Sequence, residues 1–380
     1  MILDDPRIDH GLLERYRFDR ARFLKAVTEI ESGRLTEESS KITGKIEPAA
    51  GVVDVRWDGA EAEAAKKLGE EALSRGEVAV VVLNGGMATR FGNVVKGVVE
   101  VYDQKSFIAL KAEDTKKAAQ RYGAPVPLVL MNSFATERAS LDHVAAHGRF
   151  GLAERDLLSF AQSISLRLTH EAALFIGKDG LPSYYAPGHG DFFAGIRASG
   201  VLANLLGRGV RTILFSNVDN LGATVDPAVI GYHLRSGAEM SAEVTAKRKT
   251  ASGEWDKGGA PAIVDGRQQL VEGFRLPGDL PPTYLPDFST NNFLFSAKSL
   301  EKDVHLAWHL VKKKVDDRPA LQLESIACEA SAADDAQGQP VFRTGFLRVP
   351  RDGKRGRFFP IKERVDLETS REVLRERLSG

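Results

Sequence analysis

Residues 78–101 read VAVVVLNGGMATRFGNVVKGVVEV, and this stretch decides the fold prediction. Six consecutive apolar residues, 78–83, are followed at once by Asn84, Gly85 and Gly86. A short, β-branched apolar run that ends in glycines is typical of a parallel strand that is buried on both faces. Glycines at the carboxyl end of such a strand expose backbone N–H groups, which can bind the phosphates of a ligand. The stretch therefore predicts an α/β sheet with an anion site at this edge.

The glycine pattern matches neither of the two common nucleotide-binding motifs. It lacks the G-K-[ST] ending of a P-loop, and Gly85, Gly86 and Gly92 miss the G-x-G-x-x-G spacing of a dinucleotide fingerprint. Lys96 adds a mobile positive charge after the last of these glycines. On its own the stretch is equally consistent with a tight turn followed by a solvated lysine, so other parts of the chain must decide.

The composition of the 380 residues narrows the class of ligand. The 52 basic and 52 acidic residues cancel, so we expect no nucleic acid and no membrane partner, and any anion site must be local. The single cysteine, Cys328, excludes an intrachain disulfide and is consistent with a reducing compartment. The start, MILDDPRIDH, has acids where a signal peptide needs basic residues, and no apolar run approaches the ~18 residues of a membrane span. We therefore expect a cytoplasmic protein with a small charged ligand.

Hydrophobic periodicity predicts alternating helices and strands along much of the chain. The expected helices cover 12–30, 60–75, 107–121, 136–147, 192–206 and 227–234, and the expected strands cover 78–83, 127–131 and 211–215. Beyond residue 238 we expect strands at 239–246, 260–264, 268–274 and 292–295 as antiparallel additions, then helices at 299–313 and 320–330 and a strand at 341–349. The pattern predicts an α/β, Rossmann-like fold with a mixed, mostly parallel central sheet flanked by helices. Expected divisions are an N-terminal helical appendage and linker (1–75), a main domain (76–345) and a short C-terminal segment (346–380).

Four further stretches carry a family resemblance. They are VPLVLMNSF (126–134), YYAPGHGDFFA (184–194), FSNVDNLGATVDP (215–227) and FFPIK (358–362). Together with the glycine loop they resemble the eukaryotic-type UTP–glucose-1-phosphate uridylyltransferases, also called UDP-glucose pyrophosphorylases, in the order in which that family has them. The resemblance implies a nucleotidyltransferase fold. It also implies transfer of a uridylyl group from UTP to glucose 1-phosphate, with release of pyrophosphate and the assistance of Mg²⁺.

The resemblance implies roles for individual residues. Lys96, Lys362 and Arg90 would be catalytic by neutralising the phosphates, and Asp219 would bind Mg²⁺. The implied substrate-binding residues are Leu83, Asn84, Gly85, Gly86 and Thr89 in the glycine loop, Gln162, Gly188 and His189 around the uridine and phosphates, and Asn217, Gly259, Glu272, Asn291 and Asn292 around the glucose. Structural roles stay open for several of them: a turn hydroxyl at Thr89, a turn or cap at Asp219 and a buried structural imidazole at His189.

The chemistry of the reaction accounts for these residue types. The attacking sugar phosphate is already ionised, so no general base is required, and positive charge must stabilise the α-phosphoryl group and the leaving pyrophosphate. One carboxylate together with substrate oxygens and waters suits Mg²⁺. An amide side chain such as that of Gln162 offers both a donor and an acceptor to uracil.

The chain departs from the family pattern at two places. Its glycine loop is one residue shorter than usual, Ala88 stands at the position of a common glycine, and Arg90 resembles the loop of UDP-N-acetylhexosamine pyrophosphorylases. The chain also ends about twenty residues after Lys362, so we expect no C-terminal β-helix and no oligomer formed through one, and the oligomeric state stays open.

Three alternative functions follow from these observations. One is a pyrophosphorylase for UDP-N-acetylhexosamine or another UDP-sugar, and another is a sugar-nucleotide sensor without catalysis. A glycosyltransferase is disfavoured because Asp219 is followed by Asn220 and Leu221, which breaks the D-x-D metal motif of that class.

Overall fold

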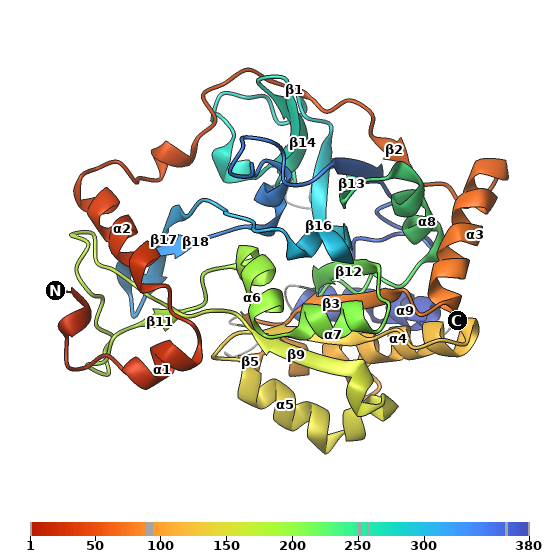
Figure 1. Cartoon of the computed structure of the whole chain (residues 1–380), viewed down its shortest axis with the longest axis horizontal. Helices are drawn as coiled ribbons and strands as arrows, with labels where there is room; N and C mark the ends of the chain where they lie inside the picture. Colours follow the sequence, from red (N-terminus) through yellow and green to blue (C-terminus); the bar gives the residue numbers. More distant parts are fainter. Residues whose placement is uncertain (1, 89–93, 250–252, 257, 362–363, 379–380) are drawn as a thin grey trace.

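A central sheet of eight strands organises the computed structural model, which describes residues 2–88, 94–249, 253–256, 258–361 and 364–378 (Figure 1). The strands follow the order β2 (Val53–Asp54), β19 (Thr344–Arg348), β13 (Met240–Ala246), β16 (Asp287–Ser296), β12 (Thr212–Asn217), β3 (Val78–Leu83), β8 (Leu128–Asn132) and β9 (Leu157–Ala161). Strand β16 is antiparallel to both of its neighbours, and the other neighbouring pairs are parallel. The predicted mixed, mostly parallel sheet is therefore confirmed.

Strand β3 is buried on both faces, as its continuous apolar sequence predicts. Val78, Val80 and Val82 belong to one hydrophobic core, whereas Ala79 and Val81 belong to the core on the opposite face. Strand β12 pairs with β3 in parallel, from Thr212 opposite Val78 to Asn217 opposite Leu83. Because the two strands end side by side, the loops that follow them emerge at the same edge of the sheet.

Helices cover both faces of the sheet (Figure 1). The core on one face includes side chains of α3 (Ala60–Ser74), α4 (Phe107–Tyr122), α8 (Pro227–Ser236) and α9 (Arg364–Leu378). The other core includes side chains of α6 (Phe192–Ala198) and α7 (Val201–Gly207). Glycines bring α3 and α8 into close contact, since a Cβ at Gly231 would stand 1.7 Å from the carbonyl oxygen of Ala65. Helix α5 (Glu137–Ala146) follows β8.

Two predicted helices are each divided in the structure. The expected helix 12–30 is instead α1 (His10–Arg15) and α2 (Arg20–Glu31), because Asp19 accepts a hydrogen bond from the N–H of Arg22 and caps a new N-terminus. The expected helix 192–206 is divided between α6 and α7 at Gly200, whose φ is +77°.

The two helices predicted for 299–313 and 320–330 are wrong. Residues 297–301 form the short 3-10 helix η9 (Ala297–Glu301), and the antiparallel hairpin of β17 (His309–Val315) and β18 (Arg318–Glu324) follows. Asp316 and Asp317 join the strands with φ of +50° and +62°, as a two-residue hairpin turn with positive φ at both positions requires. The 3-10 helix η10 (Ala327–Ser331) then replaces the end of the second predicted helix.

The strands beyond residue 238 were only partly predicted as antiparallel additions. Strands β13 and β19 pair in parallel within the main sheet, and β16, which is antiparallel to β13 and β12, also lies inside it. Of the strands predicted there, β14 (Ala260–Val264) and β15 (Arg267–Val271) make a separate antiparallel sheet with β1 (Ile46–Pro48). Strands β1 and β2 thus come from the region predicted as a linker and appendage, and the division of the chain at 75/76 and 345/346 stays a proposal.

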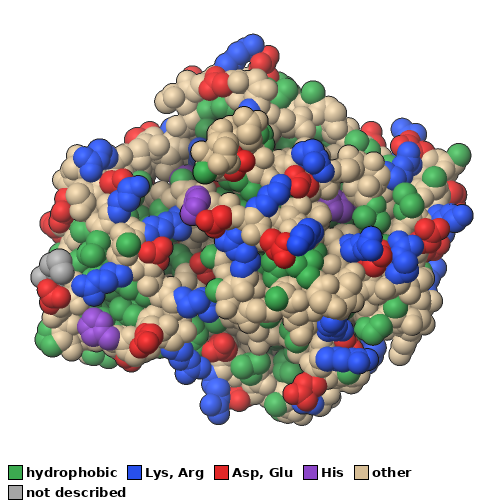
Figure 2. Space-filling view, viewed as in Figure 1, with side chains coloured by type: hydrophobic (Ala, Val, Ile, Leu, Met, Phe, Trp, Pro, Cys, Tyr) green, Lys and Arg blue, Asp and Glu red, His purple; other side chains and the backbone are tan. Residues whose placement is uncertain are grey.

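Short pairs make up the remaining strands of the described residues. They are β4 (Met87–Ala88) with β5 (Val94–Val95), β6 (Glu100–Tyr102) with β7 (Lys105–Ser106), and β10 (Ser165–Leu166) with β11 (Tyr184–Tyr185). Basic and acidic side chains intermingle on the face shown in Figure 2, as expected from their equal numbers. Within the described ranges, no helix combines the length and the apolar character that crossing a bilayer requires.

Candidate active site

A cavity of about 340 Å³ lies at the carboxyl ends of β3 and β12. Its lining residues are Leu83, Gly85, Gly86, Lys96, Gln162, Ala186, Gly188, His189, Asn217, Val218 and Asp219. All of them except Ala186 and Val218 were named from the sequence as site residues. The structure therefore brings residues from four separate stretches of sequence to one place.

Lys96 and Asp219 form an ion pair in this cavity. The ammonium group of Lys96 donates to Asp219 Oδ2, and both side chains are mostly buried. Lys96 begins the 3-10 helix η4 (Lys96–Val98), and its backbone N–H donates to the carbonyl oxygen of Gly86 at 3.2 Å. Asp219 lies just beyond the end of β12. Each partner neutralises the other, so the site presents a cation and an anion that a polyphosphate and a metal ion could separate.

Asn84 packs against the loop that carries Lys96 and does not line the cavity. Its Nδ2 donates to Asn132 Oδ1 and Ser140 Oγ, both at 2.7 Å, and the residue is 1 % exposed. Next to Lys96, a Cβ at Gly97 would stand 1.9 Å from Asn84 Oδ1, so a glycine is needed for the loop to approach this amide. The contacts of Asn84 thus fix the position of the loop that carries Lys96.

Gln162 and Gly85 are in close contact on another side of the cavity. Gln162 follows β9, and its backbone N–H donates to the carbonyl oxygen of Asn132 at 2.8 Å. A Cβ at Gly85 would stand 2.1 Å from Gln162 Nε2. The glycine therefore leaves the space that the Gln162 amide occupies.

The segment that contains Gly188 and His189 packs against residues 325–327. Gly188 has a φ of +97°, and a Cβ there would stand 2.5 Å from the carbonyl oxygen of Ser325. His189 Nδ1 accepts a hydrogen bond from the N–H of Ala327 at 3.1 Å. Burial lowers the pKa of His189 from 6.5 to about 4. The imidazole is thus neutral near pH 7 with its proton on Nε2, so it can donate one hydrogen bond to a ligand.

The five residues predicted to bind glucose occupy three environments. Asn217 lines the cavity, and Asn291 Nδ2 donates to its Oδ1 at 3.1 Å. Gly259 and Glu272 lie together, with a Cβ at Gly259 placed 3.2 Å from Glu272 Oε1, but neither lines the cavity. Asn292 is buried, 2 % exposed, and contacts other polar groups within the core.

Burial affects the protonation of Glu272. It raises the pKa of the carboxyl group, to which Cys328 Sγ donates a hydrogen bond at 3.2 Å. Cys328 is fully buried, and burial raises its own pKa as well. The two groups therefore share a desolvated environment next to Gly259.

Three predicted site residues, Thr89, Arg90 and Lys362, lie outside the described residues. Lys362 follows Ile361 in the sequence, and the backbone N–H of Ile361 donates to the carbonyl oxygen of Asp219 at 3.1 Å. The C-terminal segment thus passes beside the cavity residue Asp219 at Ile361.

Three buried charged residues behind the loop that follows Asp219 were not predicted from the sequence: Lys111, Glu243 and Arg357. One signal was present for Lys111. Lys111 shares the apolar face of the helix predicted at 107–121 with Ile108, Ala112 and Thr115. A lysine on such a face calls for a buried partner.

The described donor set offers one carboxylate to a metal ion. Asp219 lines the cavity, and the described ranges contain no group of three or more His, Cys, Asp or Glu residues that could hold an ion by themselves. Mg²⁺ is commonly held by one or two carboxylates together with substrate phosphates and waters. Asp219 therefore fits a Mg²⁺ ion that arrives with a nucleotide.

Comparisons with known proteins point to one family. The family model "UTP–glucose-1-phosphate uridylyltransferase" matches residues 35–374. The UTP–glucose-1-phosphate uridylyltransferase of Saccharomyces cerevisiae is 31 % identical over 300 residues, which are 74 % of this chain and 58 % of the yeast protein. The chain thus spans less than two thirds of the length of this relative.

Solved structures share the fold. A mutant UDP-glucose pyrophosphorylase from Leishmania major in complex with UDP-glucose matches with a TM-score of 0.70 and 22 % identity, over 94 % of this chain and 77 % of that chain. The UDP-N-acetylglucosamine pyrophosphorylase from Trypanosoma brucei matches with a TM-score of 0.68 and 18 % identity, over 91 % and 74 % of the two chains. The fold is therefore that of UDP-sugar pyrophosphorylases with either kind of sugar.

Proposed function

Because this chain belongs to the UTP–glucose-1-phosphate uridylyltransferase family, we propose that it makes UDP-glucose and pyrophosphate from UTP and glucose 1-phosphate. The observation that carries the proposal is the cavity that unites the glycine loop, the Lys96–Asp219 ion pair and Gln162. These groups are the ones that a reaction between two polyanions requires: a cation, a carboxylate for a metal ion and an amide for the base.

Lys96 and Asp219 change partners when the nucleotide binds. In the structure the Lys96 ammonium donates to Asp219. A triphosphate at the glycine loop attracts Lys96, and Asp219 becomes available to hold Mg²⁺, which when bound neutralises phosphate charge. Lys96 then stabilises the charge that develops on the α-phosphoryl group as the sugar phosphate oxygen forms its bond to phosphorus and pyrophosphate leaves. Arg90 and Lys362 are proposed to add positive charge to the same phosphates.

Uridine recognition depends on Gln162 and on the neutral form of His189. The Gln162 amide reads uracil through one donor and one acceptor, and Gly188 allows the base to lie close to the main chain. The Nε2–H group of His189 donates a hydrogen bond to an oxygen of the nucleotide, because Nδ1 already accepts one from the N–H of Ala327. A neutral donor orients the nucleotide without transferring a proton, which is consistent with a reaction that needs no general base.

Glucose recognition is proposed for the polar groups beside Asn217. The Oδ1 atom of Asn217 accepts from Asn291, which orients its Nδ2 group as a donor toward a sugar hydroxyl. Gly259, Glu272 and Asn292 do not line the described cavity, so their sugar contacts remain predictions that depend on how the bound sugar extends.

Pyrophosphate release tests the proposal directly. The enzyme is assayed with Mg²⁺ over a grid of UTP, ATP, GTP, CTP and dTTP against the 1-phosphates of glucose, galactose and N-acetylglucosamine. We expect release with UTP and glucose 1-phosphate alone. Turnover with N-acetylglucosamine 1-phosphate would move the assignment to the related pyrophosphorylases, to which the Thr89-Arg90 sequence points. No turnover with any pair, together with UDP-glucose binding, would indicate a sensor.

A Lys96→Met variant separates catalysis from binding. We expect this variant to lose turnover while it retains UDP-glucose binding, measured by calorimetry. Lys116→Met is a matched control, because Lys116 donates to the carbonyl oxygen of Phe150 and does not line the cavity.

A further inference from the structure

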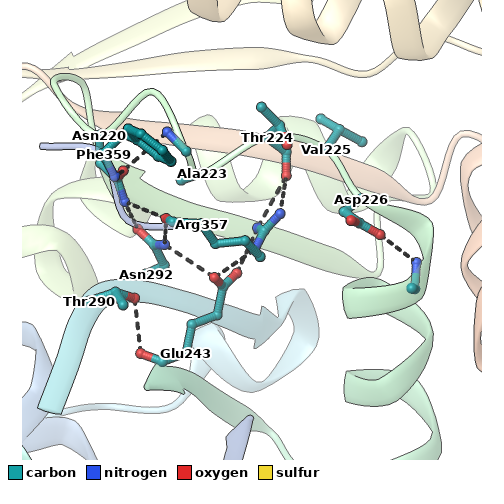
Figure 3. Close-up of polar contacts among 12 residues, drawn as sticks. Asn220, Ala223, Thr224, Val225, Asp226, Glu243, Thr290, Asn292, Arg357 and Phe359 are labelled. Atoms are coloured by element: carbon teal, nitrogen blue, oxygen red, sulfur yellow. Dashed lines mark hydrogen bonds and ion pairs between the residues drawn. The ribbon is translucent and has the colours of Figure 1, made fainter. Parts of the chain in front are cut away.

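A group of buried polar residues lies behind the loop that follows Asp219. We call it the loop brace and define it as Lys111, Asn220, Glu243, Asn292 and Arg357. All five residues are at most 3 % exposed. Figure 3 shows four of them, with Arg357 between Glu243 and the loop. None of the five lines the candidate active-site cavity, and apart from the sugar contact predicted for Asn292 they have no role in the proposed mechanism.

Lys111 connects helix α4 to both halves of this loop. Its ammonium group donates to the carbonyl oxygens of Asn220 at 2.7 Å and Ala223 at 2.8 Å. One turn further along α4, Asp114 Oδ2 accepts from the N–H of Val225 at 2.9 Å. The helix therefore holds the loop at three backbone groups, directly after the proposed metal ligand Asp219.

Arg357 holds the same loop from the opposite direction. Its Nε and Nη2 atoms donate to the two carboxylate oxygens of Glu243, each at 2.7 Å, and its guanidinium also donates to the carbonyl oxygen of Thr224 at 3.2 Å (Figure 3). Asn220 Nδ2 donates to the carbonyl oxygen of Arg357 at 3.1 Å and to Asn292 Oδ1 at 3.0 Å. Strands β13 and β16 thereby contribute to the support, since Glu243 and Asn292 lie on them.

The brace also binds the C-terminal segment to the loop. Asn220 Oδ1 accepts from the N–H of Phe359 at 2.8 Å, and the N–H of Leu221 donates to the carbonyl oxygen of Phe359 at 3.3 Å. A Cβ at Gly222 would stand 2.6 Å from the carbonyl carbon of Arg357. Any movement of the loop must therefore move the segment that leads to Lys362.

Burying the Lys111 ammonium costs folding free energy, which a residue with only a packing role would not require. Burial of a charge requires several hydrogen bonds in compensation, and an apolar side chain of similar volume often stabilises a core better. What the Lys111 ammonium does provide is a fixed distance between α4 and two carbonyl oxygens of the loop. Groups that orient a metal ligand from behind commonly change metal affinity by about 10- to 100-fold when they are removed.

We propose that Lys111 is a positioning residue that sets the Asp219 carboxylate for metal binding and aligns the C-terminal segment with the same cavity. The inference deepens the proposed function, because it assigns a residue outside the cavity to the metal-dependent step. It predicts that loss of the ammonium weakens metal binding specifically and leaves recognition of the uridine and sugar intact, because Gln162 and Asn217 are held by other contacts.

The test compares Lys111→Met with Lys116→Met, a lysine on the same helix that also donates to a backbone carbonyl oxygen but not in this loop. Mn²⁺ affinity is measured by electron paramagnetic resonance with saturating UDP-glucose, and UDP-glucose binding is measured by calorimetry in EDTA. For Lys111→Met we expect roughly tenfold or greater weakening of Mn²⁺ binding, with metal-free UDP-glucose affinity within about twofold of wild type. Lys116→Met should match wild type in both measurements.

Three outcomes would overturn the inference: unchanged Mn²⁺ affinity in Lys111→Met, a parallel loss of Mn²⁺ and metal-free UDP-glucose affinity, or the same loss in Lys116→Met. If Lys111→Met does not fold, the same two binding measurements are made on Gly222→Ala and judged by the same criteria. The added methyl group would collide with the backbone of Arg357 and displace the loop. Wild-type turnover is measured separately. Its absence would refute the proposed function, whereas the two binding measurements test the role of Lys111.

Discussion

Substitution of Gly85 by alanine should damage nucleotide recognition with little effect on stability. The new Cβ would stand 2.1 Å from Gln162 Nε2 and 3.5 Å from Ser133 Cβ. The first contact is far shorter than van der Waals separation, so the amide of Gln162 must move. Because this amide is the far end of a flexible side chain, the movement costs little folding free energy, and we expect the melting temperature to fall by no more than about 4 °C.

The size of the functional effect follows from the hydrogen bonds that Gln162 would lose. A displaced amide gives up one donor and one acceptor to uracil, and each neutral hydrogen bond contributes about 1 kcal/mol, with a further cost for uracil groups left unpaired. The two hydrogen bonds alone, about 2 kcal/mol, correspond to roughly a 30-fold decrease in kcat/KM for UTP, and the unpaired groups add to this loss. Steady-state pyrophosphate release at varied UTP measures this value.

A double-mutant cycle with Gly85→Ala and Gln162→Ala tests whether the two residues act together. If the Gly85→Ala substitution acts by displacing Gln162, adding it to Gln162→Ala should cause little further loss in kcat/KM. Additive losses would show that the methyl group acts on the nucleotide or the loop directly, and they would refute the explanation. Gly207→Ala is the control for a glycine replacement as such, since Gly207 does not line the cavity and a Cβ at that position meets no atom within 4 Å.

Four other predictions concern stability and metal dependence. Gly188→Ala should lower the free energy of unfolding by more than about 2 kcal/mol, because it combines a positive φ with backbone contact, whereas Gly180→Ala, with open space around its Cβ, should cost about 1 kcal/mol; urea titration compares them. Burial lowers the pKa of His233 from 6.5 to about 4, so the unfolded chain binds a proton first as pH falls. The free energy of unfolding should thus be undiminished above pH 6.5 and decline by up to about 3 kcal/mol toward pH 4, a decline that His233→Gln should reduce in urea titrations at several pH values; an unchanged slope would contradict it. Removal of Mg²⁺ with EDTA should stop turnover reversibly but shift the melting temperature by no more than about 1 °C, since the Lys96 ammonium neutralises Asp219 in the metal-free protein; a large shift in calorimetry would contradict this pairing. Asp317→Gly should raise the free energy of unfolding by about 0.5–1 kcal/mol, because glycine adopts the positive φ of this hairpin turn without strain; a lower value in urea titration would count against the turn assignment.

The parts of the fold that sequence predicts well are those with a strong local signal. Strand β3 agrees with its predicted bounds because six consecutive apolar residues can only be buried on both faces and glycine ends the run. The hairpin of β17 and β18 was predicted as helix because its lysines and leucines are good helix formers. The turn at Asp316 and Asp317, with two positive φ values, overrides that propensity, and nothing in the residue types alone signals it strongly.

The candidate site shows a similar division. Residues in long distinctive blocks, such as Gly188 and Asp219, were predicted and do line the cavity. Asn291 and Asn292 were predicted alike as sugar contacts, yet only Asn291 bonds to a cavity residue. The partners of Lys111 are carbonyl oxygens of a loop 109 and 112 residues further along the chain, and backbone groups carry no sequence signal. Such contacts become visible only when the chain is folded.

The position of β2 at one edge of the sheet has a consequence for folding kinetics. Val53 and Asp54 pair with Leu347 and Arg348 of β19, and Arg348 Nη1 donates to Asp54 Oδ1 at 2.9 Å across a separation of 294 residues. Strand β2 is synthesised early, but its hydrogen bonds to the sheet can form only after β19 has been synthesised. Closing so long a loop costs conformational entropy before the new contacts can compensate it, and this cost slows folding. We infer that this edge of the sheet is completed only after Arg348 has left the ribosome.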